Sequence, residues 1–364
     1  MTVERRKFLK GAALAGAGAG IASPAIAQSA PEVKWRLTSS FPKSLDTLFG
    51  GAELFAKAVS DMTDGKFQIQ CFAAGEIVPG PGALDAAQNG TVEIGHTALY
   101  YFWGKDPTFA FGSAVPFGLN SRQQSAWFYE GEGTKLFDEF LKSYNVSTLP
   151  AGNTGCQMGG WFRKEIKTVD DLKGLKFRIA GIAGAVMQKL GVVPQQIPGG
   201  DIYPALEKGT IDAAEWVGPY DDEKLGFNKV APFYYYPGFW EGGTVLNYVF
   251  NLNKLNELPK TYQAVLRNAS VMAYTHTQAR YDVQNPQAIK RLVQAGTKLR
   301  PYSNEILEAA LKASNEIYAD LSAKNANFKK IHDSMMSFRN DEYLWWQVAE
   351  FGFDNFMVRN RSKL

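Results

Sequence analysis

The chain has 364 residues, 45% hydrophobic and 21% charged, as expected for a globular protein with two or more cores, which excludes a disordered or collagen-like chain. Its formal charge of +3 comes from the first 27 residues, where four basic residues face the single acid Glu4. The neutral remainder argues against nucleic-acid binding, because phosphate neutralisation supplies much of that affinity.

Residues 1–27 are typical of an export signal. A basic start at Arg5, Arg6 and Lys7 precedes the apolar stretch 11–21 and an Ala-Ile-Ala sequence that ends at Ala27. The paired arginines resemble the twin-arginine type, whose cargo crosses the membrane already folded. We expect a periplasmic protein; the alternative is a frayed amphipathic terminus.

The chain has two cysteines, Cys71 and Cys156, and neither belongs to a CxxC or Cys/His cluster, which excludes a zinc ribbon and a thioredoxin-type motif. An oxidising compartment permits one disulfide between them. We expect free thiols, since a chain folded before export can keep them.

Residues 33–38 and 66–72 alternate in polarity as strands do, and residues 45–62 between them carry apolar residues at helical spacing. This β-α-β order predicts a right-handed crossover in a largely parallel sheet.

A short pattern occurs twice, at residues 86–95 and 205–214. Each copy predicts a helix end, a glycine suited to the left-handed cap (Gly90 or Gly209) and a short strand. The repeat indicates two similarly built α/β lobes, although helix-Gly-strand turns also recur by coincidence. In such sheets ligands bind beyond the carboxyl ends of strands, so residues 96–103 and 215–220 are expected to face one cleft.

The chain after Asn251 is mostly helical in pattern. A helix is predicted from Pro259 to about Val283, a second from Pro286 to Gly296, and an amphipathic helix over 303–323. A last helix over 341–358 carries an aromatic stripe too wide for an exposed terminus, while residues 324–340 are polar enough to form an extended arm. We expect this helix to dock on a second subunit; the alternative is a helix folded back on its own domain.

Sequence motifs give no support to an enzyme. The three histidines are far apart, and the chain after residue 27 has no GxSxG, GxGxxG or GxxxxGK[ST]. A secreted enzyme acting on an organic acid, with Glu215 or Glu241 as general base, is the rival hypothesis, and a purely structural secreted dimer is a third.

Arg178 lies in a short predicted strand, on the face opposite Phe177 and Ile179. A guanidinium among apolar neighbours needs an anion, and its planar fork matches a carboxylate. The candidates are a ligand carboxylate or an internal salt bridge.

Acidic residues follow the second repeat and an aromatic run: Glu215 precedes Trp216, and Glu241 follows residues 233–240. Carboxylates beside an anionic ligand would repel it unless a cation or a proton intervened. Oxygen donors such as Glu215, the amide of Gln157 and a backbone carbonyl suit sodium or calcium. The alternative is exposed loop acids beside core aromatics.

The strand of Arg178, residues 206–212 leading to Glu215 and Trp216, and Leu258-Pro259 together resemble the DctP-type solute-binding subunits of TRAP transporters. The resemblance covers essentially all of the chain after the signal. Residues 156–160 and 215–219 look closest to the 2-oxoacid-binding, TakP-like branch.

The resemblance implies an α/β, two-lobed periplasmic-binding-protein fold (type II-like) with a long connecting helix and a C-terminal helical extension. Lobe I would comprise residues 28–151 and about 240–280, lobe II residues 152–239 and about 281–330, and residues 331–364 a dimerisation helix. In this branch the protein resembles a homodimer that exchanges C-terminal helices.

By resemblance, Arg178 would grip the ligand carboxylate. Gln157, Glu215 and the backbone carbonyl of Trp216 would hold a cation, sodium with calcium as the alternative, that also touches the ligand. The pocket would be completed by Glu241 and an aromatic, Tyr100 or Tyr101. The implied function is capture of a small 2-oxo monocarboxylate such as pyruvate and delivery to a TRAP membrane permease; lactate, another hydroxy acid or a longer acid is the alternative cargo.

Overall fold

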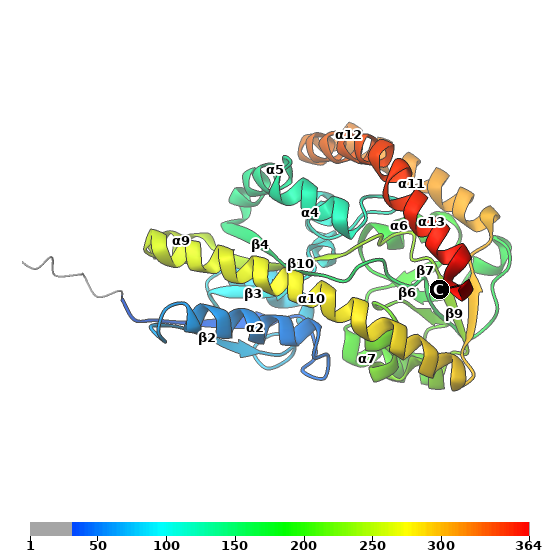
Figure 1. Cartoon of the computed structure of the whole chain (residues 1–364), viewed down its shortest axis with the longest axis horizontal. Helices are drawn as coiled ribbons and strands as arrows, with labels where there is room; N and C mark the ends of the chain where they lie inside the picture. The colour runs from blue at the N-terminus through cyan, green and yellow to red at the C-terminus, as the bar shows by residue number, and fades with distance from the viewer. Residues whose placement is uncertain (1–30, 364) are drawn as a thin grey trace, which may run out of the picture. The chain divides into compact units, whose positions relative to one another are not determined.

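The computed structural model describes residues 31–363, and the chain from Lys34 onward forms one compact unit. The described residues build two β-sheets with helices packed around them (Figure 1). The first sheet has the order β2-β1-β3-β10-β4. Its strands are β1 (Val33–Ser39), β2 (Phe67–Phe72), β3 (Ile94–Thr97), β4 (Val146–Asn153) and β10 (Val245–Asn251). Its helices are α2 (Leu48–Asp61), α3 (Ala83–Gln88), α4 (Ser121–Tyr129) and α5 (Gly133–Leu141).

The second sheet has the order β11-β9-β5-β8-β6-β7. Its strands are β5 (Gly160–Phe162), β6 (Lys176–Arg178), β7 (Val193–Gln195), β8 (Ala213–Ala214), β9 (Phe233–Tyr236) and β11 (Lys298–Pro301). The accompanying helices are α6 (Gly181–Lys189), α7 (Gly199–Glu207) and α8 (Pro219–Leu225). The predicted two-lobed α/β architecture is confirmed, with one sheet in each lobe.

The first β-α-β unit is confirmed as β1, α2 and β2, and the alternating pattern buries Leu37 and Phe67 of the strands, while Phe55 and Val59 of the helix are buried as well. The expected largely parallel sheet is confirmed in the shared direction of β1, β3 and β4, and one strand departs from it. β1 and β3 are parallel, but β10 runs antiparallel to both β3 and β4. The reason is that β10 enters from the second sheet without a helical crossover, so its direction is not constrained to match its neighbours.

The repeated pattern forms the same local structure in each lobe. Gly90 and Gly209 have φ of +78° and +71°, the left-handed region where a side chain is disfavoured, and each ends the turn after its helix. The strands that follow are β3 and β8, which lie inside different sheets.

The long helix α10 (Lys260–Gln294), preceded by α9 (Leu252–Glu257), runs through Pro286, so the predicted break there is wrong. Proline removes one backbone hydrogen bond, but α10 packs on α2 and β4 of the first lobe and on α8 of the second. Asn285 also accepts a hydrogen bond from the backbone N–H of Tyr220 at 3.0 Å. Packing on both sides of the proline therefore stabilises one continuous helix between the lobes.

The C-terminal region consists of three successive helices over its described length. The predicted amphipathic helix is confirmed as α11 (Asn304–Lys324), and α12 (Ala326–Val348) and α13 (Glu350–Asn360) follow. The extended arm expected over 324–340 is wrong, because Phe328, Ile331 and Met335 give this segment a buried helical face. The last predicted helix is interrupted between α12 and α13, at Ala349.

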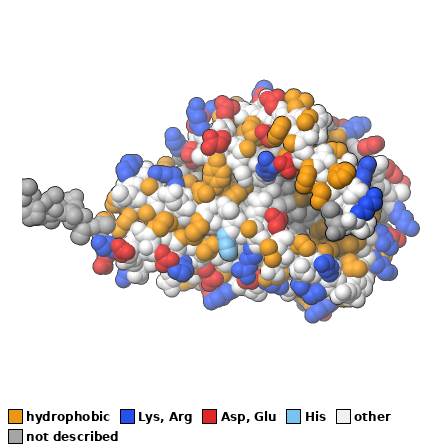
Figure 2. Space-filling model, viewed as in Figure 1, with side chains coloured by type: hydrophobic (Ala, Val, Ile, Leu, Met, Phe, Trp, Pro, Cys, Tyr) orange, Lys and Arg blue, Asp and Glu red, His pale blue; other side chains and the backbone are white. Residues whose placement is uncertain are grey.

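The aromatic stripe of the last two helices remains open to solvent in the single chain. Trp345 is 59% exposed and Phe356 is 66% exposed. Figure 2 shows hydrophobic side chains on the surface over α13. Nothing in the described part of the chain packs over these aromatic side chains closely enough to bury them.

Over residues 31–363, no helix has the length and hydropathy needed to cross a membrane. The predicted export signal, residues 1–27, lies outside the described residues. Within them, Cys71 and Cys156 are free thiols, as expected.

Candidate ligand-binding site

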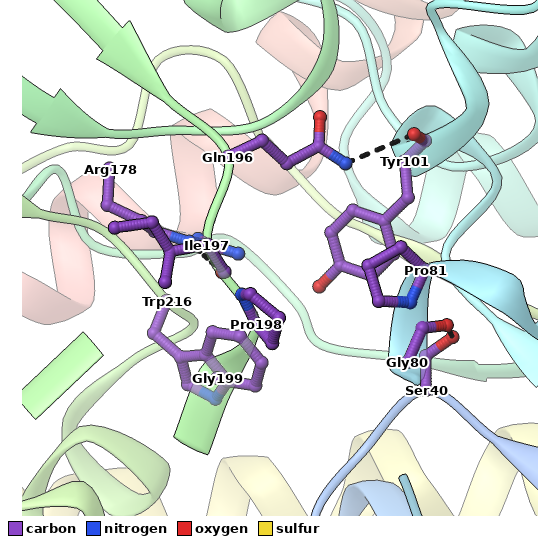
Figure 3. A pocket seen from close by; sticks show the side chains of 10 residues that line it. All are labelled: Ser40, Gly80, Pro81, Tyr101, Arg178, Gln196, Ile197, Pro198, Gly199 and Trp216. Carbon is purple, nitrogen blue, oxygen red and sulfur yellow. Dashed lines mark hydrogen bonds between the residues drawn. The ribbon is translucent and has the colours of Figure 1, made fainter. Parts of the chain in front are cut away.

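A small cavity lies where segments that follow strands of the two sheets meet (Figure 3). The first lobe contributes Ser40 and Tyr101, which follow β1 and β3, together with Gly80 and Pro81. The second lobe contributes Arg178, residues 196–199 after β7, and Trp216 after β8. The predicted convergence of both repeated strand ends on one cleft is therefore present, with Tyr101 and Trp216 lining the same space.

Strand register places Glu215 beside Arg178. β6 and β8 are parallel with Arg178 opposite Ala214, so the next residue along β8 reaches the guanidinium. Arg178 Nη1 donates to the backbone oxygen of Glu215 at 2.6 Å and contacts its carboxylate Oε1. The internal salt bridge, one of the two partners considered for Arg178, is thus present in this structure.

Arg178 is fixed by further contacts while lining the cavity. Its Nε donates to the backbone oxygen of Ile197 at 3.3 Å, and its guanidinium carbon lies 5.0 Å from the centre of the Trp216 ring. The side chain is only 2% exposed. Burial lowers the pKa of Arg178 and the carboxylate of Glu215 raises it, with a net upward direction. A charged, oriented guanidinium is therefore available to an anion that enters the cavity.

The two acids are buried, so the alternative of exposed loop carboxylates is wrong: Glu215 is 2% and Glu241 5% exposed. Burial raises the pKa of Glu215 to about 7, against the opposing effect of Arg178. Burial, with repulsion from Glu215, raises the pKa of Glu241 well above its ordinary value. One arginine accompanies two buried carboxyls, and a site with this balance favours an additional proton or cation.

Gln157 lies between two threonine hydroxyls, Thr154 at 3.1 Å and Thr244 at 3.0 Å, and a buried acceptor pair. That pair is the backbone oxygen of Trp216, 2.9 Å from the amide, and Glu241 Oε2, 2.5 Å away. If the amide nitrogen faces the pair, it donates to both; if the amide oxygen faces it, three oxygens converge without a hydrogen between them. The second orientation matches what a hard cation requires.

The donor set fits a group I or II ion rather than a transition metal. No group of three or more His, Cys, Asp or Glu side chains suited to a metal occurs in residues 31–363. The converging atoms are instead an amide, a backbone carbonyl and a carboxylate, the oxygen ligands that sodium and calcium prefer. Glu215 Oε2, buried and without a hydrogen-bond partner among the described residues, is a further oxygen donor close by.

The two tyrosines left open by the sequence have different positions. Tyr101 lines the cavity, whereas the hydroxyl of Tyr100 hydrogen bonds to Glu241. Their rings meet edge to face with centres 5.0 Å apart. Tyr101 is therefore placed to touch a ligand, and Tyr100 to hold an acid behind it.

Sequence reasoning missed the wall formed by residues 196–199 and by Ser40 and Pro81. β7 is parallel to β6, with Gln195 opposite Arg178, so this segment follows a third strand end at the same edge. The sequence did contain a pattern that could have found this wall. Residues 193–195 follow the helix that starts after Arg178, and a strand predicted there would have placed residues 196–199 beside Arg178.

The model of the family described as bacterial extracellular solute-binding protein, family 7 (DctP), matches residues 38–325. This chain belongs to the DctP family. Members of the family are solute-binding receptors of TRAP transporters and not enzymes, so the hypotheses of a secreted enzyme and of a purely structural dimer are wrong. The periplasmic location expected from the sequence agrees with the family.

Among relatives of this DctP protein, a monocarboxylate 2-oxoacid-binding periplasmic protein of Nostoc sp. is 51% identical over 97% of this chain and 99% of its own. A TRAP transporter solute-binding protein of Bordetella bronchiseptica, solved as a mixed-occupancy dimer with calcium and picolinate in one site, is 48% identical with a TM-score of 0.90, over 92% of this chain and 99% of that one. A counterpart from Pseudoalteromonas atlantica, solved with sodium and pyruvate, is 37% identical with a TM-score of 0.87, over 89% of this chain and 99% of that one.

Proposed function

We propose that this DctP protein captures a small 2-oxo monocarboxylate of the pyruvate type together with a sodium or calcium ion, and delivers it to a TRAP membrane permease. The observation that carries the proposal is the convergence of Gln157, the Trp216 carbonyl and Glu241 on one side of a cavity that Arg178 lines. The names of the Nostoc, Bordetella and Pseudoalteromonas proteins support the same pairing of an organic acid with a cation.

Each residue then has a defined role. Arg178 binds the ligand carboxylate through its planar fork, and its contacts to Ile197 and Trp216 hold the fork in place. Gln157, Glu215 and the Trp216 carbonyl hold the cation, with the Glu241 carboxylate beside them. The cation balances the buried acids and attracts the carboxylate and keto oxygens of the ligand. Tyr101 closes the first-lobe side and Tyr100 orients Glu241. Enclosure between the lobes strengthens these charge interactions, because water is excluded.

The lobe boundaries, the export route and the dimer form part of the same proposal. Lobe I comprises residues 28–151 and about 240–280, and lobe II residues 152–239 and about 281–330, with residues 331–364 as the dimerisation segment. Export uses a twin-arginine signal.

A second copy covers the exposed stripe of α12 and α13 by exchange of the C-terminal helices, which would restore a buried environment for Trp345 and Phe356.

Calorimetry of the mature protein with pyruvate, with sodium or calcium added or both removed, tests the proposed cargo. We expect tight stoichiometric binding with a cation and much weaker binding without one. Parallel titrations separate the alternative cargoes. A longer 2-oxo acid tests the size of the cavity, whereas lactate, which has the same heavy-atom skeleton as pyruvate, tests the requirement for a keto oxygen. Absence of pyruvate binding under every cation condition would refute the proposal.

A further inference from the structure

Asp46 connects the two lobes at a place separate from the cavity. It lies in the loop between β1 and α2 of the first lobe. Its carboxylate forms ion pairs with Lys224 of α8 and Arg280 of α10, and accepts a hydrogen bond from the hydroxyl of Tyr220, also on α8, at 3.1 Å. Three donors on second-lobe and connecting helices therefore converge on one first-lobe acid.

The acid is ionised in this setting. Burial raises the pKa of Asp46, but the hydrogen bonds and charges of Lys224, Tyr220 and Arg280 outweigh burial and lower it overall. Its side chain is 42% exposed, so water and salt reach the cluster. The interaction is therefore of the screened, easily broken kind, suited to repeated opening and closing.

The helix that carries two of the donors is attached directly to the candidate site. α8 begins at Pro219, immediately after the segment of Glu215 and Trp216. Asp222 of α8 fastens that segment: it accepts from the backbone N–H of Val217 at 3.2 Å and from Trp161 Nε1 of the sheet at 2.9 Å. Movement of α8 relative to Asp46 therefore moves one wall of the cavity.

We infer that Asp46, oriented by Arg280, is a latch that holds the lobes closed over a bound solute and whose contacts to Tyr220 and Lys224 of α8 break before release. The inference rests on the proposed function, in that a solute binds between the lobes. It assigns a positioning role in binding to a residue that does not line the cavity. Its loss should affect ligand dissociation more than ligand capture, because the latch contacts must break before the lobes separate.

The test is stopped-flow tryptophan fluorescence of the full mature protein with sodium pyruvate. Asp46→Asn should raise the dissociation rate about threefold to tenfold and leave the association rate within about twofold, the scale of a small exposed ion network. The matched control is Asp61→Asn, which removes the Lys57–Asp61 pair inside α2 and should change neither rate. In the double variant with Asp46→Asn and Lys224→Met, the dissociation rate should rise by less than the product of the increases in the two single variants, as expected for residues in contact.

Dissociation rates of Asp46→Asn equal to those of the wild-type protein would overturn the latch. Failure of the wild-type protein to bind pyruvate would instead count against the proposed cargo. In that case the Asp46 contacts are tested by hydrogen exchange of the ligand-free protein. In the ligand-free protein the backbone amides of α8 should exchange faster in Asp46→Asn than in Asp61→Asn. Equal exchange in the two variants would overturn the latch independently of the cargo.

Discussion

Arg178 and Glu215 form a buried ion pair beside the cavity, with each side chain 2% exposed and the arginine also bonded to the backbone of its partner at 2.6 Å. Burying an ion pair carries a desolvation penalty that can exceed the attraction between the charges, so such a pair is weak evidence for stability. An alternative role is to orient one of the charges for ligand binding. Here the pair joins the residue proposed to grip an anion to a residue proposed to hold a cation. Binding of the two ions is thereby expected to be coupled.

Arg178→Lys should reduce pyruvate affinity by about 1.5 kcal/mol or more, because a point charge cannot reproduce two parallel bonds to a carboxylate. Calorimetry measures the change. Arg291→Lys is the matched control, since Arg291 pairs with Glu223 on the surface and should leave affinity unchanged. Wild-type affinity in Arg178→Lys would contradict the assignment.

Glu215→Gln should weaken cation binding and pyruvate binding together, since coupling between two ligands is thermodynamically reciprocal. Titration of pyruvate at several sodium and calcium concentrations should show the cation dependence reduced in the variant. Unchanged affinity of the wild-type protein in chelated, sodium-free buffer would show that Glu215 acts on the ligand directly or not at all.

The buried acid Asp221 should make the ligand-free protein less stable as pH rises. Burial raises its pKa to about 7, so the folded state holds a proton that the unfolded state, with an ordinary value near 3.8, has already lost. Between these values the folded state binds more protons, and the free energy of unfolding falls with rising pH, on the order of 1 kcal/mol per pKa unit.

Urea unfolding at several pH values between 4.5 and 7.5 checks this direction. Asp221→Asn keeps an acceptor for the Tyr281 hydroxyl, which lies 2.5 Å from Asp221, and should flatten the pH dependence. If the free energy of unfolding has the same pH dependence in the variant and the wild-type protein, the prediction for Asp221 is wrong. Other groups, such as Asp222, whose pKa burial raises to about 6, then determine the pH dependence.

Deletion of residues 341–364 should give a monomer that is less stable and prone to aggregate, because the groove that the exchanged helix would fill is then uncovered. Light scattering of the intact mature protein should give the mass of two chains at micromolar concentration. A mass near one chain would refute the exchange, whatever the truncation does.

The local features of this protein followed from its sequence. The left-handed glycines Gly90 and Gly209, the first β-α-β unit and the strand position of Arg178 depend on residues within a few positions, so periodicity and turn chemistry suffice to predict them. The expectation that the ends of β3 and β8 converge also held, because it rests on a general property of α/β sheets.

Tertiary packing decided the rest. Continuity of α10 through Pro286 depends on contacts with both lobes, and the antiparallel course of β10 depends on where the chain returns from the second sheet. The partner of Arg178 was fixed by the register of β6 and β8, and the bridge from Asp46 to Lys224 joins residues 178 positions apart. Such pairings minimise the free energy of the whole packed chain rather than of any local segment, so no pattern of neighbouring residues specifies them.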